Sequence, residues 1–412
     1  MSVTRRQFLK TVVIVPAAAA AFPMPLLRGM MGVPGSTRNL VLLDLKGGND
    51  GLNTVVPFGV DGGLYYSEYR KSLAIPQNQL LQISPQIGLN PTMTHLKAHF
   101  DAGRLAIVQG VGYPNPSFSH EVAETIWQTG VTSGSSATGW LARYLEQVGA
   151  QASPNAVSLN EQLTLLLADS GTFVPAFESL DDFTFPYDGW HSDDAQNRRD
   201  CYESIANALG AAPNEKIATM SGTSTGILDL IDTFATIPSF SHVGVYPQGG
   251  VSGRFKLVAK LLNANIGMRY FHVPFGGFDT HADQEVDDYH SERMGNISQT
   301  ISAFYDDLVA MGIADDTIVV VFSEFGRTVY QNGSGGTDHG YVNPVLVFGS
   351  SVAGGLIGAH PSLDPQDATD EGEPPMVTDF RNVFGTLVSQ WLGGDAAAAI
   401  PGWSLTPVPF LA

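Results

Sequence analysis

Five short apolar runs separated by helical patterns are the feature that most limits the folds open to this chain. The apolar runs cover residues 39–45, 104–111, 268–274, 317–322 and 343–348, and helical patterns lie at 91–102, 119–129, 137–148, 193–208, 253–265 and 286–311. Strands that alternate with helices form parallel βαβ units, and strands without polar alternation are buried on both faces. The pattern therefore predicts an α/β fold with a mostly parallel sheet sandwiched by helices.

Two segments, at residues 1–36 and at about 165–250, differ from this regular pattern of strands and helices. Residues 1–36 contain Arg5 and Arg6 ahead of an alanine-rich apolar run with two prolines. Such a segment is typical of a twin-arginine export signal rather than of a membrane-spanning helix, so we expect the export machinery as a partner and a periplasmic or extracellular location. We expect residues 37–412 to form one domain without a membrane span, with a loop-rich cap inserted at about 165–250.

Composition excludes several classes of protein. The 412 residues include 21 Lys and Arg against 40 Asp and Glu, for a net charge of −19. A chain this acidic is repelled by nucleic acid. The single cysteine, Cys201, excludes an intramolecular disulfide and a cysteine-rich metal site. Any metal ion would need His, Asp, Glu or hydroxyl ligands.

Polar residues and glycines cluster where the predicted strands end or begin. The candidate residues in these clusters are Asp50, Ser119, His120, Asp279, His281, Glu324, Arg327, Asp338 and His339. In open α/β sheets ligands bind beyond the carboxyl ends of the strands, so we expect these side chains to meet in one crevice. Singly, each has a simpler interpretation, such as a helix cap or a hydrogen-bonded Asp–His pair.

The residue types in this crevice suggest metal chemistry. The carboxylates and imidazoles of Asp50, Asp279, His281, Asp338 and His339, with Glu324, are suitable ligands for zinc first, and for manganese, iron or calcium as alternatives. Ser119 opens a predicted helix, where an oxyanion is favoured, and the adjacent His120 is a candidate base or ligand. Arg327 suits the binding of an anion or a salt bridge with Glu324.

The order of these clusters resembles that of the alkaline phosphatase–sulfatase superfamily. Five runs, at 45–53, 116–120, 277–281, 323–328 and 379–381, are similar to those of the exported domain-of-unknown-function family 1501, and the likeness spans nearly the whole mature chain. The resemblance implies an alkaline phosphatase-like fold and a metal site. This chain departs from the superfamily pattern in two places. Glu324 and Phe325 stand where the superfamily has Asp and His, and the position of the superfamily nucleophile falls nearer His120 than Ser119. These departures leave a site with one metal ion or with none as options beside a two-metal site.

The leading hypothesis is an exported metal-dependent hydrolase of phosphate or sulfate esters that acts on a small anionic substrate. A metal ion would polarise the ester oxygen and activate Ser119 or a water molecule, and Arg327 would hold the anion. One alternative is a non-catalytic envelope protein that keeps the fold and binds a ligand or partner. Another is a metal-dependent mutase or transferase.

Overall fold

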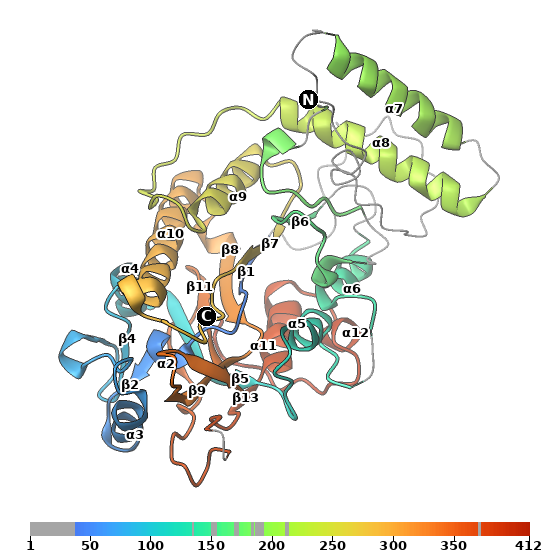
Figure 1. Ribbon diagram of the computed structural model, residues 1–412. Coiled ribbons are helices and arrows are strands. Elements are labelled where there is room, and N and C mark those ends of the chain that lie inside the picture. The colour runs from blue at the N-terminus through green and yellow to red at the C-terminus, as the bar shows by residue number, and fades with distance from the viewer. Residues whose placement is uncertain are drawn as a thin grey trace.

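A mixed sheet of eight strands forms the centre of the fold (Figure 1). The computed structural model describes residues 38–133, 136–149, 155–168, 173–182, 185, 193–210, 214–369 and 372–412, so the predicted export signal lies outside the described residues. The strand order is β12-β5-β11-β8-β1-β7-β6, and β13 also pairs with β5. The bounds are β1 Asn39–Leu45, β5 Leu105–Gly112, β6 Ala156–Ser158, β7 Tyr270–Phe275, β8 Thr317–Ser323, β11 Asn343–Phe348, β12 Gly355–Ile357 and β13 Thr378–Asp379.

The strands are parallel except for β11. β1 runs parallel to β7 and β8, and β6, β12 and β13 run parallel to their neighbours. β11 runs antiparallel to both β5 and β8, and its first residue, Asn343, pairs with Val111 near the end of β5. The mostly parallel sheet is confirmed. The reversal of β11 brings the segment that precedes it to the edge where the parallel strands end.

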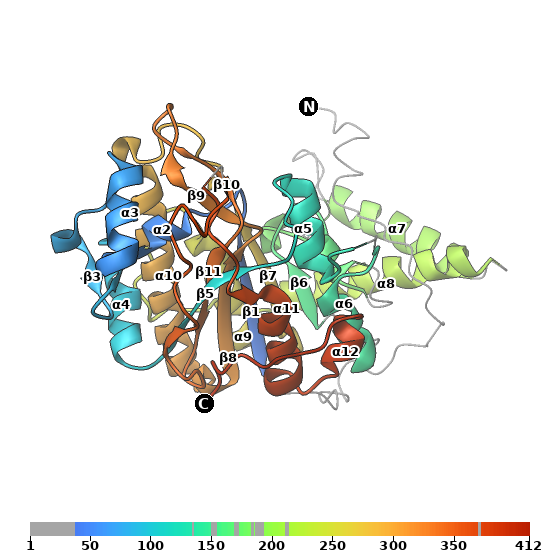
Figure 2. The same ribbon diagram turned by 90° about the horizontal axis from the view of Figure 1, so that it is seen from below.

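Helices cover both faces of the sheet, as predicted. Val41 and Leu43 of β1 pack in the core beneath α4 (Thr94–Asp101), α9 (Ser252–Ala264) and α10 (Tyr289–Met311). Leu40 and Leu42, on the opposite face, pack in a second core with α5 (His120–Thr129), α6 (Trp140–Gln147) and α11 (Phe380–Thr386). Figure 2 shows α4 and α10 on one side of the sheet and α5, α6 and α11 on the other. Alternate residues of one buried strand therefore supply both cores.

Smaller elements surround this sandwich. A three-stranded sheet joins β2 (Val55–Pro57), β4 (Ile87–Leu89) and β3 (Leu81–Gln82). A hairpin joins β9 (Gly326–Gln331) to β10 (Thr337–Gly340), two segments for which the sequence pattern predicts no strand. Three shorter helices are α2 Gly51–Thr54, α3 Val60–Arg70 and α12 Ala396–Ala399. Short 3-10 segments lie at Gln77–Gln79, Leu165–Leu167, Leu180–Asp182, Val286–Asp288 and Ala314–Asp316, and a π-helix lies at Leu387–Trp391.

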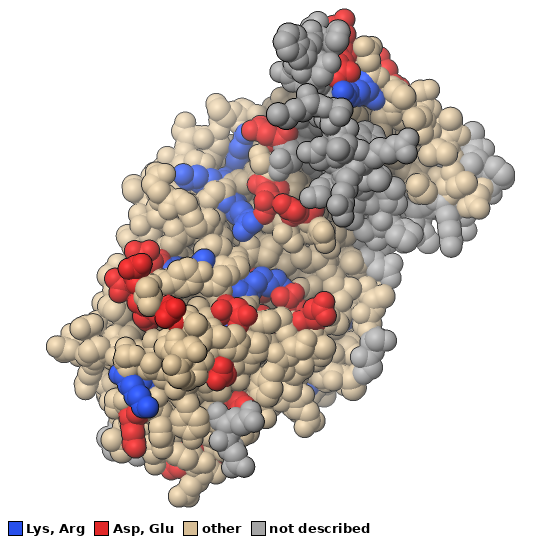
Figure 3. Space-filling view, in the orientation of Figure 1, with Lys and Arg blue, Asp and Glu red and all other residues tan. Residues whose placement is uncertain are grey.

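Two helices occupy the predicted insertion. α7 (Asp194–Gly210) and α8 (Glu215–Ala235) lie side by side and away from the central sheet in both views. The sequence pattern predicted α7 but not α8. In the described part of the chain, no helix combines the length and apolar character needed to cross a bilayer. Acidic side chains are spread over the face shown in Figure 3 rather than gathered in one patch.

Candidate metal centre

The loops at one edge of the sheet bring together residues that are far apart in the sequence. His120 is the first residue of α5, Asp279 and His281 follow β7, and Glu324 follows β8. Asp338 and His339 lie in β10, which the reversed β11 holds at the same edge. Of the predicted site residues, these six converge in the structure.

Three imidazoles in this group are each held through Nδ1, which leaves Nε2 as the nitrogen on the side of Asp279. Each Nδ1 lies at hydrogen-bond distance from an oxygen acceptor: 2.8 Å between His120 and Glu324 Oε1, 2.9 Å between His281 and Asp338 Oδ1, and 2.8 Å between His339 and the Phe118 carbonyl. A carbonyl or carboxylate oxygen only accepts, so each Nδ1 carries the hydrogen in the neutral ring and each Nε2 keeps its lone pair. Metal-binding histidines are fixed in this way in proteins.

The three Nε2 atoms all face Asp279. Those of His281 and His339 lie 3.2 Å from Asp279 Oδ1 and 2.9 Å from each other. His120 Nε2 lies 3.4 Å from Asp279 Oδ2. The ligand atoms of His120, Asp279 and His339 are all within 4.8 Å of one another. Two imidazole nitrogens and one carboxylate oxygen thus surround a common point, and His281 Nε2 lies beside Asp279 and His339 at its border.

The donor set fits a divalent ion of the zinc, iron or manganese type. His120 Nε2 is buried and has no hydrogen-bond partner among the described residues, so it has an unused lone pair directed at Asp279. Zinc–nitrogen bonds of about 2.0–2.1 Å in tetrahedral geometry place donor atoms roughly 3.3 Å apart, close to the 3.2–3.4 Å between the Asp279 oxygens and the three Nε2 atoms. Calcium prefers oxygen ligands throughout, so a set that contains imidazole nitrogens disfavours that predicted alternative.

The electrostatics of the group favour a bound cation. Burial alone would raise the pKa of Asp279, but the hydrogen bond and the positive charge of the Arg327 guanidinium outweigh it and lower the pKa to about 2. Burial lowers the pKa of His339, which keeps this ring neutral. The hydrogen bond to Glu324 raises the pKa of His120. Asp279 is therefore an anion at neutral pH, and His339 can offer a lone pair.

Glu324 and Asp338 lie behind the imidazoles. Glu324 is buried, and its Oε1 accepts from Gly47 N at 2.8 Å as well as from His120, while its Oε2 accepts from Ser323 Oγ at 2.8 Å. Its carboxylate therefore orients His120 rather than facing the common point. Asp338 likewise bonds to His281 Nδ1. The structure gives these two predicted ligands the role of orienting the imidazoles.

The guanidinium of Arg327 is bonded to groups of the protein itself rather than directed at a site for a bound anion. Its buried guanidinium donates to Gly48 O at 2.7 Å, Thr337 O at 2.8 Å, Phe278 O at 2.9 Å and Asp279 Oδ1 at 2.9 Å, and also to Gly47 O. Four carbonyls and a carboxylate thus engage the group that was predicted to hold an anion. Its salt-bridge partner is Asp279 rather than Glu324. Arg327 ties together the loops that carry the centre.

Asp50 lies outside the centre. It caps α2, accepting from Leu52 N at 3.2 Å and Asn53 N at 3.3 Å, and it forms a fully buried ion pair with Arg70. Burial would raise the pKa of Asp50, but the Arg70 guanidinium holds it below its usual value. The helix-cap interpretation describes this residue, and we leave it out of the ligand set.

Ser119 and Phe325 border the centre. Ser119 is the exposed N-cap of α5, one residue before His120, and its hydroxyl makes no cap hydrogen bond. The Phe325 ring lies against two imidazoles, with ring centroids 4.9 Å from His120 and 4.4 Å from His339. Gly48 makes room for this ring, because a Cβ there would lie 2.4 Å from it.

Sequence reasoning missed the part played by Phe118. Its carbonyl holds His339, a role that any residue at this position could supply, so the residue type gives no signal. His120, in contrast, could be singled out from the sequence, because the resemblance described above places the nucleophile of the superfamily nearer His120 than Ser119.

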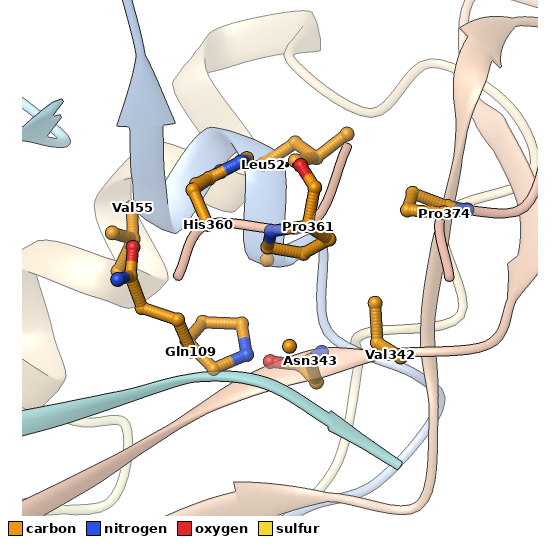
Figure 4. Close-up of a pocket in the computed structure, with 11 residues that line it drawn as sticks. Leu52, Val55, Gln109, Val342, Asn343, His360, Pro361 and Pro374 are labelled. Carbon is orange, nitrogen blue, oxygen red and sulfur yellow. Dashed lines mark hydrogen bonds between the residues drawn. The ribbon is translucent and has the colours of Figure 1, made fainter. Parts of the chain in front are cut away.

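Figure 4 shows a separate cavity of the structure. Its walls are mainly apolar, with Leu52, Val342 and Pro361 among them, and its polar members are Gln109, Asn343 and His360. Asn343 lines it and also donates to Phe325 O at 3.1 Å. The six converging residues do not line this cavity.

Several solved structures resemble this structure, all at low sequence identity. The lipoteichoic acid synthase LtaP from Listeria monocytogenes has 10% identity and a TM-score of 0.34, over 82% of this chain and 74% of that one. The periplasmic domain of EptC from Escherichia coli, in complex with Zn, has 13% identity and a TM-score of 0.35, over 76% and 73%. An alkaline phosphatase superfamily protein from Vibrio parahaemolyticus has 11% identity and a TM-score of 0.33, over 78% and 62%. No statement about activity follows from similarity at this level.

Comparison of sequences gives a clearer result. The search of curated proteins found no match. The family described as "Protein of unknown function (DUF1501)" matches residues 37–382, which is most of the chain and includes every residue of the candidate centre. The chain belongs to the DUF1501 family.

Proposed function

We propose that this protein is an exported metal-dependent hydrolase of phosphate or sulfate esters. The observation that carries the proposal is the convergence on Asp279 of three imidazoles whose Nδ1 atoms are already bonded to oxygen acceptors. His120, His281, His339 and Asp279 would hold the ion. A divalent ion held there would supply Lewis-acid polarisation of an ester oxygen and activation of water.

The surrounding residues would keep this arrangement rigid. Glu324, Asp338 and the Phe118 carbonyl fix the three rings, and Arg327 fixes Asp279. Ser119, at the start of α5, is the candidate for a protein nucleophile, with water as the alternative. The twin-arginine pattern in residues 1–36 supports export to the periplasm or beyond.

A second candidate function is binding without catalysis. Phe325 favours it, because an apolar ring in contact with His120 and His339 occupies space where a further ligand could have stood. In that case the protein would bind a ligand or partner in the envelope and hydrolyse neither aryl phosphates nor aryl sulfates.

Metal analysis and ester hydrolysis test the proposal together. Protein purified without chelators should contain close to one equivalent of zinc, iron or manganese by mass spectrometry of the metal, and should hydrolyse at least one aryl phosphate or aryl sulfate. The double variant Asp279→Asn, His281→Gln should lose both properties. His95→Gln, which changes an exposed histidine on α4, is the matched control and should retain both.

Two results would contradict this proposal. Protein that binds none of the three metals after their addition would remove the centre itself. Protein that binds metal but leaves every ester intact would favour the binding function, and product analysis would separate hydrolysis from group transfer.

A further inference from the structure

The basic side chains around the centre are already engaged by the protein. Arg327 is engaged by carbonyls and Asp279, as described above. Lys46 Nζ is buried and lies 2.9 Å from both Asp44 and Glu124. Arg293 donates to Gly276 O at 2.9 Å and to Tyr289 Oη at 2.7 Å. Among the described residues near Asp279, each of these cations has partners within the chain, although Arg293 Nε has none and the partners of Arg293 are neutral groups.

The carboxylates around the centre therefore set its charge. Asp279, Glu324 and Asp338 are three carboxylates, and in the described part of the chain Arg327 is the guanidinium that forms an ion pair with one of them. Together they leave two negative charges, and a divalent ion would bring the net charge of this group to zero. Each negative charge on a substrate is then repelled by the carboxylates a few ångströms away, so a dianion is opposed more strongly than a monoanion.

An aromatic pair stands beside the centre. The rings of Phe118 and Tyr341 are stacked, with centroids 5.3 Å apart and planes 14° from parallel, and Phe118 is 37% exposed. The Phe118 carbonyl holds His339, and Tyr341 follows His339 by two residues. Backbone contacts thus fix the pair next to one of the metal-binding imidazoles. Val122, on the first turn of α5, is also exposed.

We propose that the centre acts on monoanionic esters that carry a ring, such as aryl sulfates or aryl phosphodiesters, and selects against dianionic phosphate monoesters. This inference rests on the proposed hydrolase function. The carboxylates around the centre account for the charge preference, and the exposed part of the Phe118 side chain provides the surface on which the ring stacks. Phe118 is the specificity-determining side chain in this account.

Unreactive ligands test the inference without requiring turnover. The probes are benzenesulfonate, methanesulfonate and phenylphosphonate at pH 8.5, where the first two are monoanions and the third is a dianion. Their binding to the metal-loaded full chain is measured by calorimetry. Stacking between aromatic rings contributes about 0.5–1.5 kcal/mol, so benzenesulfonate should bind roughly 2- to 13-fold more tightly than methanesulfonate. It should also bind at least as tightly as phenylphosphonate.

Variants of Phe118 separate stacking from a structural role. Phe118→Leu should remove the preference for benzenesulfonate over methanesulfonate, and Phe118→Tyr should retain it. Because both variants keep the backbone carbonyl that holds His339, metal content should equal that of the wild type. Tyr341→Leu offers a second test of the same pair, with a smaller loss expected.

The outcomes distinguish this inference from the proposed function. Selective binding of benzenesulfonate with no hydrolysis of any ester would uphold the inference on the ligand class and contradict the hydrolase. Phenylphosphonate bound 10-fold more tightly than benzenesulfonate would overturn the charge argument. An unchanged ring preference in Phe118→Leu, or no binding of any probe, would overturn the inference even if hydrolysis is found.

Discussion

Glu324→Gln isolates the electrostatic role of the carboxylate behind His120. In the wild type, Oε1 accepts from His120 Nδ1 and Gly47 N, and Oε2 accepts from Ser323 Oγ. Glutamine can keep its carbonyl oxygen in the first position and place its amide group beside Ser323. The Ser323 hydroxyl can then donate to Leu45 O, which lies 2.6 Å away. The substitution removes charge while leaving every buried polar group with a partner.

The magnitude follows from the effect of such carboxylates on metal affinity. Loss of a group that orients a metal-binding histidine weakens binding by about 10- to 100-fold. At an ion concentration 100 times the wild-type Kd, binding stabilises the wild type by about 2.7 kcal/mol, and a 100-fold weaker variant by only about 0.4 kcal/mol. An unfolding entropy of about 2.1 cal/mol/K per residue gives roughly 0.8 kcal/mol/K for this domain, so the ion-induced rise in Tm should shrink by about 3 °C.

Two measurements and one control complete this test. Metal affinity is measured by competition with a chromophoric chelator, and Tm is measured with and without the ion. Asp338→Asn is the matched control: Asp338 performs the same service for His281 but is 59% exposed, so solvent screening should limit its loss of affinity to a few-fold. Wild-type affinity in Glu324→Gln would refute the assigned role. A fall of more than about 3 kcal/mol in the stability of the metal-free variant would refute the claim that its hydrogen bonds can be re-formed.

Three further predictions concern stability around the centre. Arg70→Met should lower the free energy of unfolding by about 3–5 kcal/mol at pH 7 in urea titrations, because it leaves Asp50 buried without its partner. Since Arg70 depresses the pKa of Asp50, the pair stabilises the wild type above about pH 4 and this contribution is lost as the pH falls, so the difference should shrink at pH 3.5. Gly48→Ala should cost more stability than Gly103→Ala, because both have φ near +70° but only Gly48 would clash, with Phe325; equal losses would contradict this reasoning. Chelation should lower the Tm of the wild type and leave that of Asp279→Asn unchanged in a thermal scan.

The main strands of the sheet could be predicted because each is marked by a short apolar run in the sequence itself. Runs such as 39–45 and 317–322 are short, mainly apolar and without regular polar alternation, which is typical of a strand buried on both faces. The direction of β11 could not be predicted in the same way, because an apolar run is compatible with either direction. α8 was missed for a different reason: its centre, at 221–226, contains only serine, threonine and glycine, which are weak helix formers.

The meeting of these side chains at one edge of the sheet could be predicted, but the partner of each side chain could not. Asp50 follows a strand as Asp279 does, and nothing in the local sequence separates them. What separates them is Arg70, which engages Asp50 in a buried ion pair from a helix 20 residues away. The partners of Arg327 could not be predicted for a similar reason. They are mainly backbone carbonyls, and every residue type carries one, so the sequence gives no sign of which carbonyls will lie near this guanidinium.

The adjacent residues Asp338 and His339 show why the division of roles depends on tertiary structure. Both were predicted as ligands, because carboxylate and imidazole are equally suitable donors. The pairing of β10 with β9 is irregular between Thr337 and His339, and the side chains of Asp338 and His339 both contact the imidazole of His281. His339 Nε2 also lies near Asp279, whereas Asp338 contacts the opposite nitrogen of the His281 ring. The difference between a candidate ligand and a group that orients another candidate ligand therefore depends on where the loop after β7 places Asp279 and His281, and the sequence around residues 338 and 339 does not contain this information.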